Sequence, residues 1–515
     1  MGSDSRKRRP HRQGIFNGGF VLTLAISMFV LMAPCYAASR NIPFVEGYYN
    51  IFFMGKKAGY IHETVQPLDR TRFLYKSKES WEAKRGGAEM KIERSESYTV
   101  GMDLKPIDFS IYQNMNGQIT RTTGKLNAGV MIVKQNVGGS EKTLKIKLAA
   151  GTIVPGLARF MVMRSNPKPG SVFSSKFFLA DFNRVVDAKV KILEERKEKL
   201  PNGSCTAIVM QTTFLNMVTK DVFCKNSGLG VRSEIANLNI KIEITTKKEA
   251  KAKFDKSDIF SEIVIKSPRN LMPTRKLKKL RVEIKGDPLP GVVEDSRQTI
   301  MRKLSSKNTL VIDLEAQAVP EGKIFFPIKD KMLSPYLAPE AYIQSDAKGI
   351  RAAARKAVDG EKRLWPAVKR LVRFTYEYIS SKNYDEGYLS ALEVLKKRSG
   401  DCTEHSIFFV ALARSIGIPA RLLLGITHIN GFFGYHQWPE VYVGKQGWVQ
   451  VDPTLGQYTV DASHLALAHM SGSKKDWIEA IANVMKFIGS DKLDILSAEW
   501  KNGTRWIKAK GRKNN

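Results

Sequence analysis

The sequence is poor in cysteine and in acidic residues. It has four Cys among 515 residues, far too few for a fold held together by a disulfide framework. Only 50 Asp and Glu stand against 83 Lys and Arg, so the formal net charge is +33. After the first few dozen residues, no apolar run reaches the ~20 residues that a membrane-spanning helix needs. These shortages exclude a disulfide scaffold and leave the N-terminus as the one segment to examine for membrane targeting.

The remaining composition is that of an ordinary globular protein. Hydrophobic residues make up 43% of the chain and charged residues 26%, which excludes wholesale disorder. At roughly 150 residues per domain, the length predicts about three domains, each able to bury a core.

The N-terminus has the pattern of an export signal. Basic residues between Arg6 and Arg12 precede an apolar run from Phe20 to Ala33, and small residues follow at Ala37 and Ala38. The run has the length of a signal-peptide core and is short for a spanning helix. We therefore predict a signal peptide over residues 1–37 and a periplasmic or extracellular protein. Two alternatives stay open: retention as an uncleaved membrane anchor, and lipidation at Cys35.

The basic charge favours anionic partners outside the cell. Loss of residues 1–37 would remove five basic side chains and one acidic one, so the mature chain stays strongly basic. Phospholipid headgroups and acidic cell-wall polymers are the expected partners, and a solvated surface without a dedicated partner is the alternative. No nucleic-acid-binding module is present, and export argues against such a partner. Residues 501–515 carry six Lys and Arg and no acid, which predicts a mobile basic tail.

Turn signals and hydrophobic periodicity divide the mature chain. Residues 42–246 alternate with period two between turns about 8–12 residues apart, which predicts an antiparallel β domain with a short helix inserted near Ile153–Met163. Residues 257–345 predict a small second β unit after a polar link, and residues 350–490 carry helical spacing followed by strands. The expected elements of these two regions are strands at Ile259–Ile265, Leu280–Ile284 and Leu310–Leu314, and helices at Ala352–Val358, Leu364–Ile379, Ser390–Lys397 and Trp477–Ile488.

Cys205 and Cys224 lie in the first β domain and are predicted to pair. The midpoint between them falls at Phe214/Leu215, and a hairpin turning there would place the two residues opposite each other. An exported protein meets an oxidising environment, which favours a disulfide. Two independent buried thiols are the alternative.

Cys402 has the setting of a nucleophile. Gly400-Asp401 precedes it as a helix cap, and an apolar helix follows that ends at Gly417-Ile418-Pro419. Cys402 is therefore expected in the first helical turn, where free N–H groups and the helix dipole favour a thiolate. A buried cysteine without reactivity is the alternative.

His436 and Asp452 lie on a predicted hairpin that turns between Gly444 and Gly447. A two-residue loop would put their side chains on opposite faces, whereas a three-residue loop pairs either Trp438 or Glu440 with Asp452 and puts both on one face. The second arrangement permits a Cys–His–Asp triad for acyl transfer: Cys402 attacks a carbonyl, His436 moves the proton and Asp452 orients the imidazole. The Cys402 N–H is the natural oxyanion donor, and the sequence does not identify the second, for which Tyr384 and Tyr388 are candidates.

These segments resemble the transglutaminase-like superfamily, relatives of papain-type cysteine peptidases. The similar segments are Asn383-Tyr384-Asp385, Gly400-Asp401-Cys402, Gly417-Ile418-Pro419-Ala420-Arg421, His436-x-Trp438-x-Glu440-Val441, Gly447-Trp448-Val449 and Asp452-Pro453-Thr454. Gln437 departs from the Ala that the family often has. The resemblance covers about Lys362–His464 and implies an α+β, papain-like core with a Cys402, His436 and Asp452 triad. Members include protein crosslinkers, peptidases and cell-wall amidases, and some are inactive.

Two functional hypotheses follow. The first is an exported transglutaminase-like cysteine hydrolase or acyltransferase that acts on amide bonds of a protein, peptide or cell-wall polymer. The second is a non-catalytic envelope binding or scaffold protein built on the same core. His405 and His428 are rivals of His436 as the base. Cys402 and His405 have the spacing of a metal pair, but no second pair accompanies them, so we expect no metal and no cofactor.

Overall fold

The computed structural model describes the chain from residue 42 to residue 508 with internal gaps. The described residues are 42–85, 88–215, 217–235, 239–253, 264–286, 289–320, 323–382, 388–470, 480, 483, 484, 487 and 493–508. The predicted signal segment 1–37, the strand expected over Ile259–Ile265 except its last two residues, and most of the helix expected over Trp477–Ile488 lie outside them. Among the described residues, no helix has both the length and the apolarity to cross a membrane.

The first half of the chain forms one long sheet of 15 strands within the described residues. Nearly all neighbours along the chain pair antiparallel, and buried and exposed side chains alternate along strands such as β1, as a sheet with one face in a core requires. The strands are β1 (Val45–Phe53), β2 (Lys56–Pro67), β3 (Arg72–Arg85), β4 (Ala88–Gly101), β5 (Pro106–Met115), β6 (Gln118–Asn127), β7 (Val130–Val137), β8 (Ser140–Lys147), β9 (Thr152–Ile153), β10 (Val172–Leu179), β11 (Arg184–Leu200), β12 (Gly203–Phe214), β13 (Met217–Cys224), β14 (Gly230–Ile235) and β15 (Ile240–Thr245).

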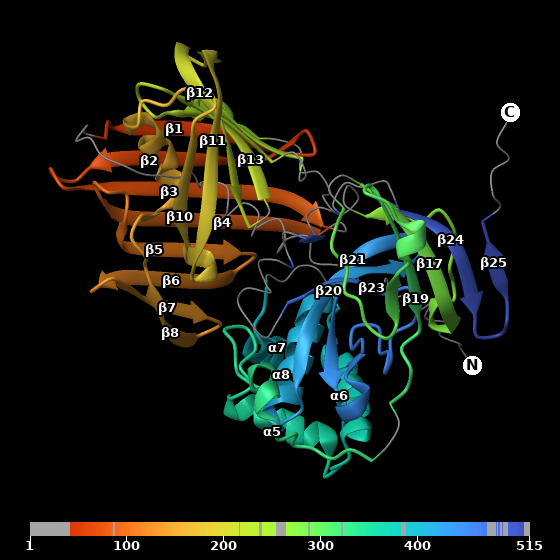
Figure 1. The fold of residues 1–515 in the computed structure, drawn as a ribbon. Coiled ribbons are helices and arrows are strands. Elements are labelled where there is room, and N and C mark those ends of the chain that lie inside the picture. The colour runs from red at the N-terminus through yellow and green to blue at the C-terminus, as the bar shows by residue number, and fades with distance from the viewer. Residues whose placement is uncertain are drawn as a thin grey trace, which may run out of the picture.

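This sheet bends back on itself, so that β10 to β13 lie across β1 to β5 (Figure 1). Aromatic side chains fill the space between the layers: the rings of Phe109 on β5 and Phe178 on β10 are 5.4 Å apart. The helix expected near Ile153–Met163 is present as η1 (Pro155–Leu157) and α2 (Ala158–Arg164), both almost wholly buried. The other short elements of this half are η2 (Ala180–Phe182) and α3 (Lys247–Ala250), the latter within the predicted polar link.

Two arginines are buried between the layers with carboxylate partners. Arg94 contacts Glu96 at 2.8 Å and Asp181 at 2.9 Å, and Arg159 contacts Glu63 at 2.7 Å. Removing one partner of such a buried pair leaves an uncompensated charge and typically costs ~3–5 kcal/mol. These pairs therefore fix how the two layers meet, because Arg94 lies on β4 and Asp181 follows β10.

Cys205 and Cys224 form a disulfide with a Cα–Cα distance of 5.7 Å. The hairpin of β12 and β13 turns one residue later than expected, with Phe214 opposite Met217 and Ala207 opposite Cys224. The two cysteines are thus diagonal neighbours instead of directly opposed. Because the register differs by two residues in total, both side chains still point to the same face of the sheet.

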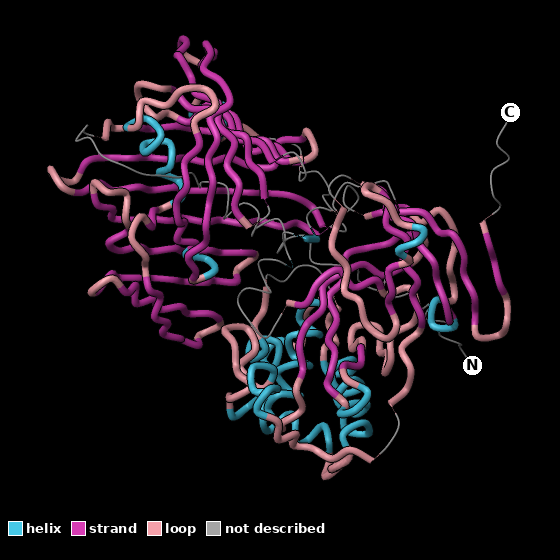
Figure 2. Tube along the Cα trace, in the orientation of Figure 1, coloured by secondary structure: helices cyan, strands magenta, loops and turns pink. Residues whose placement is uncertain are grey.

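The second half combines a helical layer with a sheet that carries the predicted site. Helices α5 to α8 gather beside strands β20 to β23 (Figure 2). The helices are α5 (Lys348–Val358), α6 (Leu364–Tyr378), α7 (Ala391–Lys397) and α8 (Cys402–Ser415), and the strands are β16 (Ile265–Lys266), β20 (Ala420–Ile429), β21 (Phe432–Tyr442), β22 (Trp448–Gln450) and β23 (Leu465–His469). The short helices here are η4 (Thr274–Lys276), η5 (Arg302–Leu304), η6 (Lys331–Tyr336) and η7 (Gly444–Gln446). An α+β protein, with an antiparallel β domain ahead of a helix-and-strand core, is therefore confirmed.

A third sheet corrects the boundaries expected for the small β unit and the tail. Strands β17 (Leu277–Lys285), β18 (Gln298–Ile300) and β19 (Thr309–Glu315) pair with β24 (Leu493–Trp500) and β25 (Arg505–Ile507) from the chain end. The unit predicted over 257–345 is thus completed by strands that follow the core, while β16 joins β21 of the core sheet. The mobile tail predicted over 501–515 is wrong as far as residue 507. Residues Arg505–Ile507 form an edge strand that pairs with β24, and Trp506 is less exposed than its two neighbours.

The β domain touches the core at the N-terminus of α7. Gln118 Nε2 donates a hydrogen bond to Glu393 Oε1 at 2.6 Å, and Glu393 Oε2 accepts from the Ser390 hydroxyl at 2.7 Å in a capping box. Gly138, with φ of +58°, lies so close that a Cβ would be 2.4 Å from Glu393 Oε2 and 2.5 Å from Ser390 Oγ. Glycine is therefore required here by the contact as well as by the turn.

We predict that Gly138→Ala weakens this contact and that Gly139→Ala does not. Both glycines have positive φ, but a Cβ at Gly139 has nothing within 4 Å. If backbone strain alone decided, alanine would cost less stability at Gly138 than at Gly139, because the φ angle of Gly138 is closer to the left-handed helical region. The methyl group must displace the Glu393 cap, which costs ~1 kcal/mol. Native-state hydrogen exchange of the α7 amide groups measures this cost, and equal opening free energies in the two variants would show that the contact contributes nothing.

Candidate active site at the start of α8

Cys402 is the first residue of α8, and the two preceding residues explain why. Asp401 is the N-cap, and its side chain accepts from the Thr403 N–H at 2.8 Å, while Glu404 Oε2 accepts from the Asp401 N–H at 3.0 Å. Gly400 has φ of +140°, and a Cβ there would be 2.3 Å from the Glu404 Cβ. The predicted cap and helix start are confirmed, and they place the thiol where the helix dipole favours an anion.

Helix α8 is the centre of the core. Every residue from Cys402 to Arg414 is buried, as expected for a helix packed on all sides. One turn after Cys402, on the same face, the Ser406 hydroxyl donates to the Gln437 backbone carbonyl on β21 at 2.9 Å. This contact fixes the first turn of α8 against the strand that carries His436. Cys402 itself has an exposed fraction of 0%.

The hairpin has one of the two registers that put His436 and Asp452 on one face. Glu440 pairs with Gln450 and Tyr442 with Trp448, a register that continues to Trp438 opposite Asp452. The Val443 N–H donates to the Gly447 carbonyl at 2.8 Å, so the loop is the three residues Gly444–Gln446, which form the one-turn helix η7. This is the three-residue loop expected from the sequence that places Trp438 opposite Asp452.

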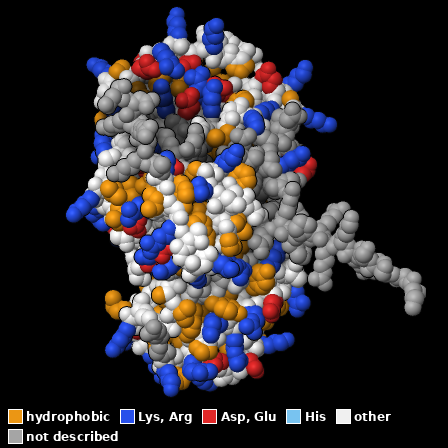
Figure 3. All heavy atoms as spheres, turned by 90° about the vertical axis from the view of Figure 1, so that its right-hand side faces the viewer, with side chains coloured by type: hydrophobic (Ala, Val, Ile, Leu, Met, Phe, Trp, Pro, Cys, Tyr) orange, Lys and Arg blue, Asp and Glu red, His pale blue; other side chains and the backbone are white. Residues whose placement is uncertain are grey.

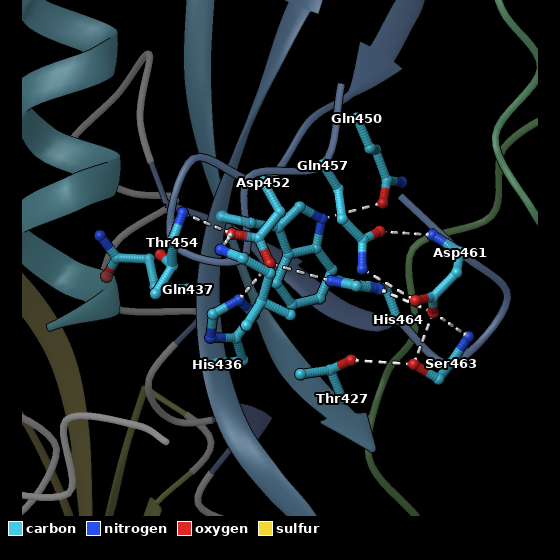
Figure 4. A network of polar contacts seen from close by, with 12 residues as sticks. Thr427, His436, Gln437, Gln450, Asp452, Thr454, Gln457, Asp461, Ser463 and His464 are labelled. Atoms are coloured by element: carbon cyan, nitrogen blue, oxygen red, sulfur yellow. Dashed lines mark hydrogen bonds and ion pairs between the residues drawn. The ribbon is translucent and has the colours of Figure 1, made fainter. Parts of the chain in front are cut away.

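His436 and Asp452 meet in a fully buried polar cluster (Figure 4). The His436 Nε2 and the Asp452 Oδ2 are 2.8 Å apart. The second nitrogen, His436 Nδ1, is buried and has no hydrogen-bond partner among the described residues. Asp452 is itself held rigidly, because its Oδ1 accepts the N–H groups of Thr454 at 2.8 Å and Leu455 at 3.1 Å. The ring therefore has one nitrogen tied to a carboxylate and the other available.

A second imidazole lies on the same carboxylate oxygen, which sequence reasoning missed. His464 Nε2 is 3.2 Å from Asp452 Oδ2, and His464 Nδ1 is 3.3 Å from Asp461 Oδ1. Asp461 in turn accepts hydrogen bonds from the hydroxyl of Ser463 at 2.6 Å and from the side-chain amide of Gln457. No recognised motif indicated this contact, since Asp461 and His464 lie in the segment before β23 without a known spacing to Cys402.

The pKa values of this cluster follow from its hydrogen bonds. Burial opposes ionisation of Asp452, but the adjacent His436 and His464 hold the pKa of its carboxyl well below the usual range. Burial likewise disfavours a charged His464, but the hydrogen bonds to Asp452 and Asp461 outweigh it and raise its pKa to about 8. Asp452 is thus ionised at neutral pH, and His464 is mostly a cation.

The rival histidines are placed away from this role. His405 Nδ1 is 2.6 Å from the Asp401 backbone carbonyl, and burial, with the Lys382 charge, lowers its pKa to about 3. His428 lies on β20, its ring edge against Phe433, and neither ring nitrogen has a hydrogen-bond partner among the described residues. Within the part of the chain that the structure describes, neither imidazole contacts a carboxylate that could orient it.

Of the two tyrosines considered as oxyanion donors, Tyr384 lies outside the described residues. Tyr388 is buried, with its ring edge-on to Tyr342 at 4.6 Å. Burial, with nearby charges that include Glu404 and Cys402, raises the pKa of Tyr388 well above its usual value. Its hydroxyl therefore stays protonated close to the electrostatic field of Cys402.

One group within the described residues has the composition of a metal site. The ligand atoms of His436, Asp452 and His464 lie within 4.8 Å of one another. Both imidazoles, however, direct Nε2 to the same oxygen, and the distances of 2.8 and 3.2 Å are those of hydrogen bonds. The set is satisfied by protons alone, so we interpret it as a hydrogen-bonded network.

Two family models match this chain. The model of the transglutaminase-like superfamily matches residues 347–453, and that of a protein of unknown function, DUF3108, matches residues 48–226. The uncharacterized protein YebA of Bacillus subtilis (strain 168) is 35% identical over 99 residues, which cover 16% of this chain. The match spans only 13% of that relative's length.

Two solved structures are similar at low identity. One, described as a "Putative Cysteine Protease from Cytophaga hutchinsonii", is 16% identical with a TM-score of 0.30, covering 45% of this chain and 88% of that one. The other, a β-barrel-like protein of the domain of unknown function DUF1849 from Brucella abortus, is 11% identical with a TM-score of 0.33, covering 40% and 98%. The family match rests on the sequence models, and by it the chain contains a transglutaminase-like superfamily core at residues 347–453, behind a DUF3108-type antiparallel β domain.

Proposed function

We propose that this protein is an exported cysteine hydrolase or acyltransferase that acts on amide bonds through Cys402, His436 and Asp452. One observation carries the proposal. His436 has one nitrogen hydrogen-bonded to a buried, ionised carboxylate at 2.8 Å and the other buried without a partner among the described residues, on the strand that packs against the first turn of the Cys402 helix. His405 and His428 also have a buried nitrogen without a partner, but neither contacts a carboxylate among the described residues, so it is the combination of the two features that distinguishes His436.

The reaction follows from these roles. Cys402 Sγ attacks the carbonyl carbon of an amide, and the negative charge on the oxygen is met by the Cys402 N–H and, we infer, by the Tyr388 hydroxyl. Before the attack the thiol proton of Cys402 passes to His436, and His436 gives that proton to the leaving amine as the C–N bond breaks, which leaves a thioester on Cys402. Water or a second amine then attacks the thioester carbonyl and gives its proton to His436 as the C–S bond breaks, which releases the acid or the new amide and restores the Cys402 thiolate. Asp452 holds the imidazole with Nε2 protonated, so that Nδ1 is the nitrogen that works.

The substrate we propose is a protein, peptide or cell-wall polymer of the envelope. The N-terminal export pattern and the charge of +33 support it. Figure 3 shows Lys and Arg side chains spread over a whole face of the molecule instead of in one patch. Such a distribution fits binding to an extended anionic surface. Long-range electrostatic attraction, and not one basic pocket, would then bring the protein to its substrate.

We predict that Cys402 reacts with iodoacetamide at pH 6 at least about tenfold faster than a free thiol. A free thiol with a pKa of ~8.5 is only ~0.3% ionised at that pH, whereas an imidazolium partner and the helix start favour the thiolate. Because Cys205 and Cys224 are joined, peptide mapping can assign the label to Cys402 without interference from them. Stopped-flow or mass-spectrometric rates between pH 4 and 10 measure the effect.

The variants His436→Ala and His428→Asn are the matched pair for this measurement. Loss of the His436 imidazole should return the rate to that of an ordinary thiol, while His428→Asn should keep the wild-type rate, since His428 contacts no member of the triad described above. A wild-type Cys402 no faster than a model thiol, or equal rates in wild type and His436→Ala, would contradict the proposed catalysis.

A non-catalytic envelope scaffold is the second candidate, and the burial of the site favours it. Cys402, His436 and Asp452 each have an exposed fraction of 0%, so a substrate reaches the sulfur only if a covering segment moves. A core used for packing alone has no need of such a motion. Binding of the chain to anionic surfaces would then be its whole activity.

We predict that p-nitrophenyl acetate separates these two candidates. An enzyme should release a burst of about one p-nitrophenolate per chain as Cys402 is acylated, and Cys402→Ala should abolish the burst. Binding to vesicles that contain phosphatidylglycerol should survive Cys402→Ala in either case, because it depends on surface charge. Vesicle binding without any burst in the wild type would select the scaffold.

A further inference from the structure

Asp452 accepts four hydrogen bonds. The one from His464 has no part in the triad chemistry. Its Oδ1 accepts two backbone N–H groups, and its Oδ2 accepts His436 at 2.8 Å and His464 at 3.2 Å. Four acceptor positions are all that a carboxylate offers. His464 therefore fills the last hydrogen-bond acceptor position of Asp452, on the same oxygen that accepts from His436.

The protonation state of His464 is fixed by its two partners. Its Nε2 faces Asp452 and its Nδ1 faces Asp461, and ionised carboxylates only accept hydrogen bonds. Both contacts are satisfied only when both ring nitrogens carry a hydrogen, that is, in the imidazolium form. His436, with a single carboxylate contact, needs only the neutral Nε2–H form. The same oxygen thus lies between a cation and the base of the triad.

We propose that His464 is a positioning residue that shares the Asp452 charge with His436 and so limits how strongly His436 holds a proton. This inference rests on the proposed function of Cys402 and His436. While His464 is a cation, part of the Asp452 field is neutralised, and the His436 imidazolium is stabilised less. The base then releases its proton to the leaving amine more readily, and the Asp452 side chain cannot rotate away, because both its oxygens are tied.

Other charged or titratable groups lie near this cluster and also contribute to its electrostatic field. Asp461 contacts His464 directly, and Arg297 donates to the His464 backbone carbonyl at 2.6 Å. From α8, His405 is neutral, as its lowered pKa requires. Lys382, on the segment after α6, interacts with Asp452; burial lowers its pKa to about 8, although Asp452 opposes this. Lys382 therefore titrates in the same range as His464 and needs its own control.

The test is the variant His464→Gln, followed by NMR of the imidazole nitrogens of His436 in the full chain. Glutamine keeps an N–H donor for Asp452 but carries no charge. The titration midpoint of His436 should rise by about half to one pH unit, a three- to tenfold change in proton affinity. The pH at which the rate of Cys402 alkylation has its upper inflection should rise together with this midpoint.

Two control variants separate charge from structure. In the Lys382→Met background the shift caused by His464→Gln should persist, which assigns it to His464. Thr427→Val removes a hydroxyl that lies 3.1 Å from the Ser463 hydroxyl, at the far end of the network, with no change of charge. Thr427→Val should not change the titration midpoint of His436, even if it lowers the fraction of protein with a reactive Cys402.

The outcomes for the two proposals are distinct. An unchanged or lowered His436 midpoint in His464→Gln overturns the role of His464, even with a reactive Cys402. A normal, slow thiol overturns the proposed function, while the NMR titration still reports on His464. A wild-type midpoint that shifts on addition of EDTA would mean that His436, Asp452 and His464 hold a metal ion, and would overturn the inference as well.

Discussion

The site depends on one buried carboxylate, that of Asp452. A negative charge with no exposure to water is costly, and it persists here because two backbone N–H groups and two imidazoles surround it. The backbone contributes as much as the side chains. Asp452 exchanges both main-chain hydrogen bonds with Gln457, which closes the loop that directs its side chain toward β21. This loop orients His436 from one side, and the Trp438 ring, stacked on the imidazole with 5.7 Å between ring centroids, orients it as well.

The cysteine is positioned by a separate and equally local device. Gly400 leaves room for Glu404, Glu404 closes the capping box with Asp401, and the other oxygen of Glu404 accepts the Leu389 N–H at 3.1 Å. Leu389 immediately precedes the Ser390 cap of α7, where the β domain makes its contact through Gln118 and Gly138. The start of α8 and the surface of the β domain are thus joined through one short helix. These hydrogen bonds are one route by which a displacement at either end reaches the other.

Local patterns in the sequence predicted the parts of the fold that local chemistry determines. The cap at Asp401, the helix start at Cys402 and the facing of His436 with Asp452 depend on neighbouring residues or on hairpin parity, and these could be derived. His464 could not, because its contact with Asp452 is made by a loop whose path depends on β23 pairing with β20. The strands β24 and β25 were missed for a similar reason: β24 pairs with β17, more than 200 residues earlier in the chain, and β25 pairs only with β24 among the described strands. Burial of Cys402 is likewise a tertiary property that no spacing reveals.

The third sheet has a consequence for the order in which the molecule is made. Strand β17 is synthesised before the core, yet its neighbour β24 comes after it, at Leu493–Trp500. A growing chain can pack α5 to α8 against β20 and β21 while one edge of β17 still lacks its partner, since domains form as they emerge from the ribosome. That edge closes only when the last strands arrive. A polypeptide released early would present an open β edge, a template for pairing with other chains and a mark by which quality control can recognise an unfinished product.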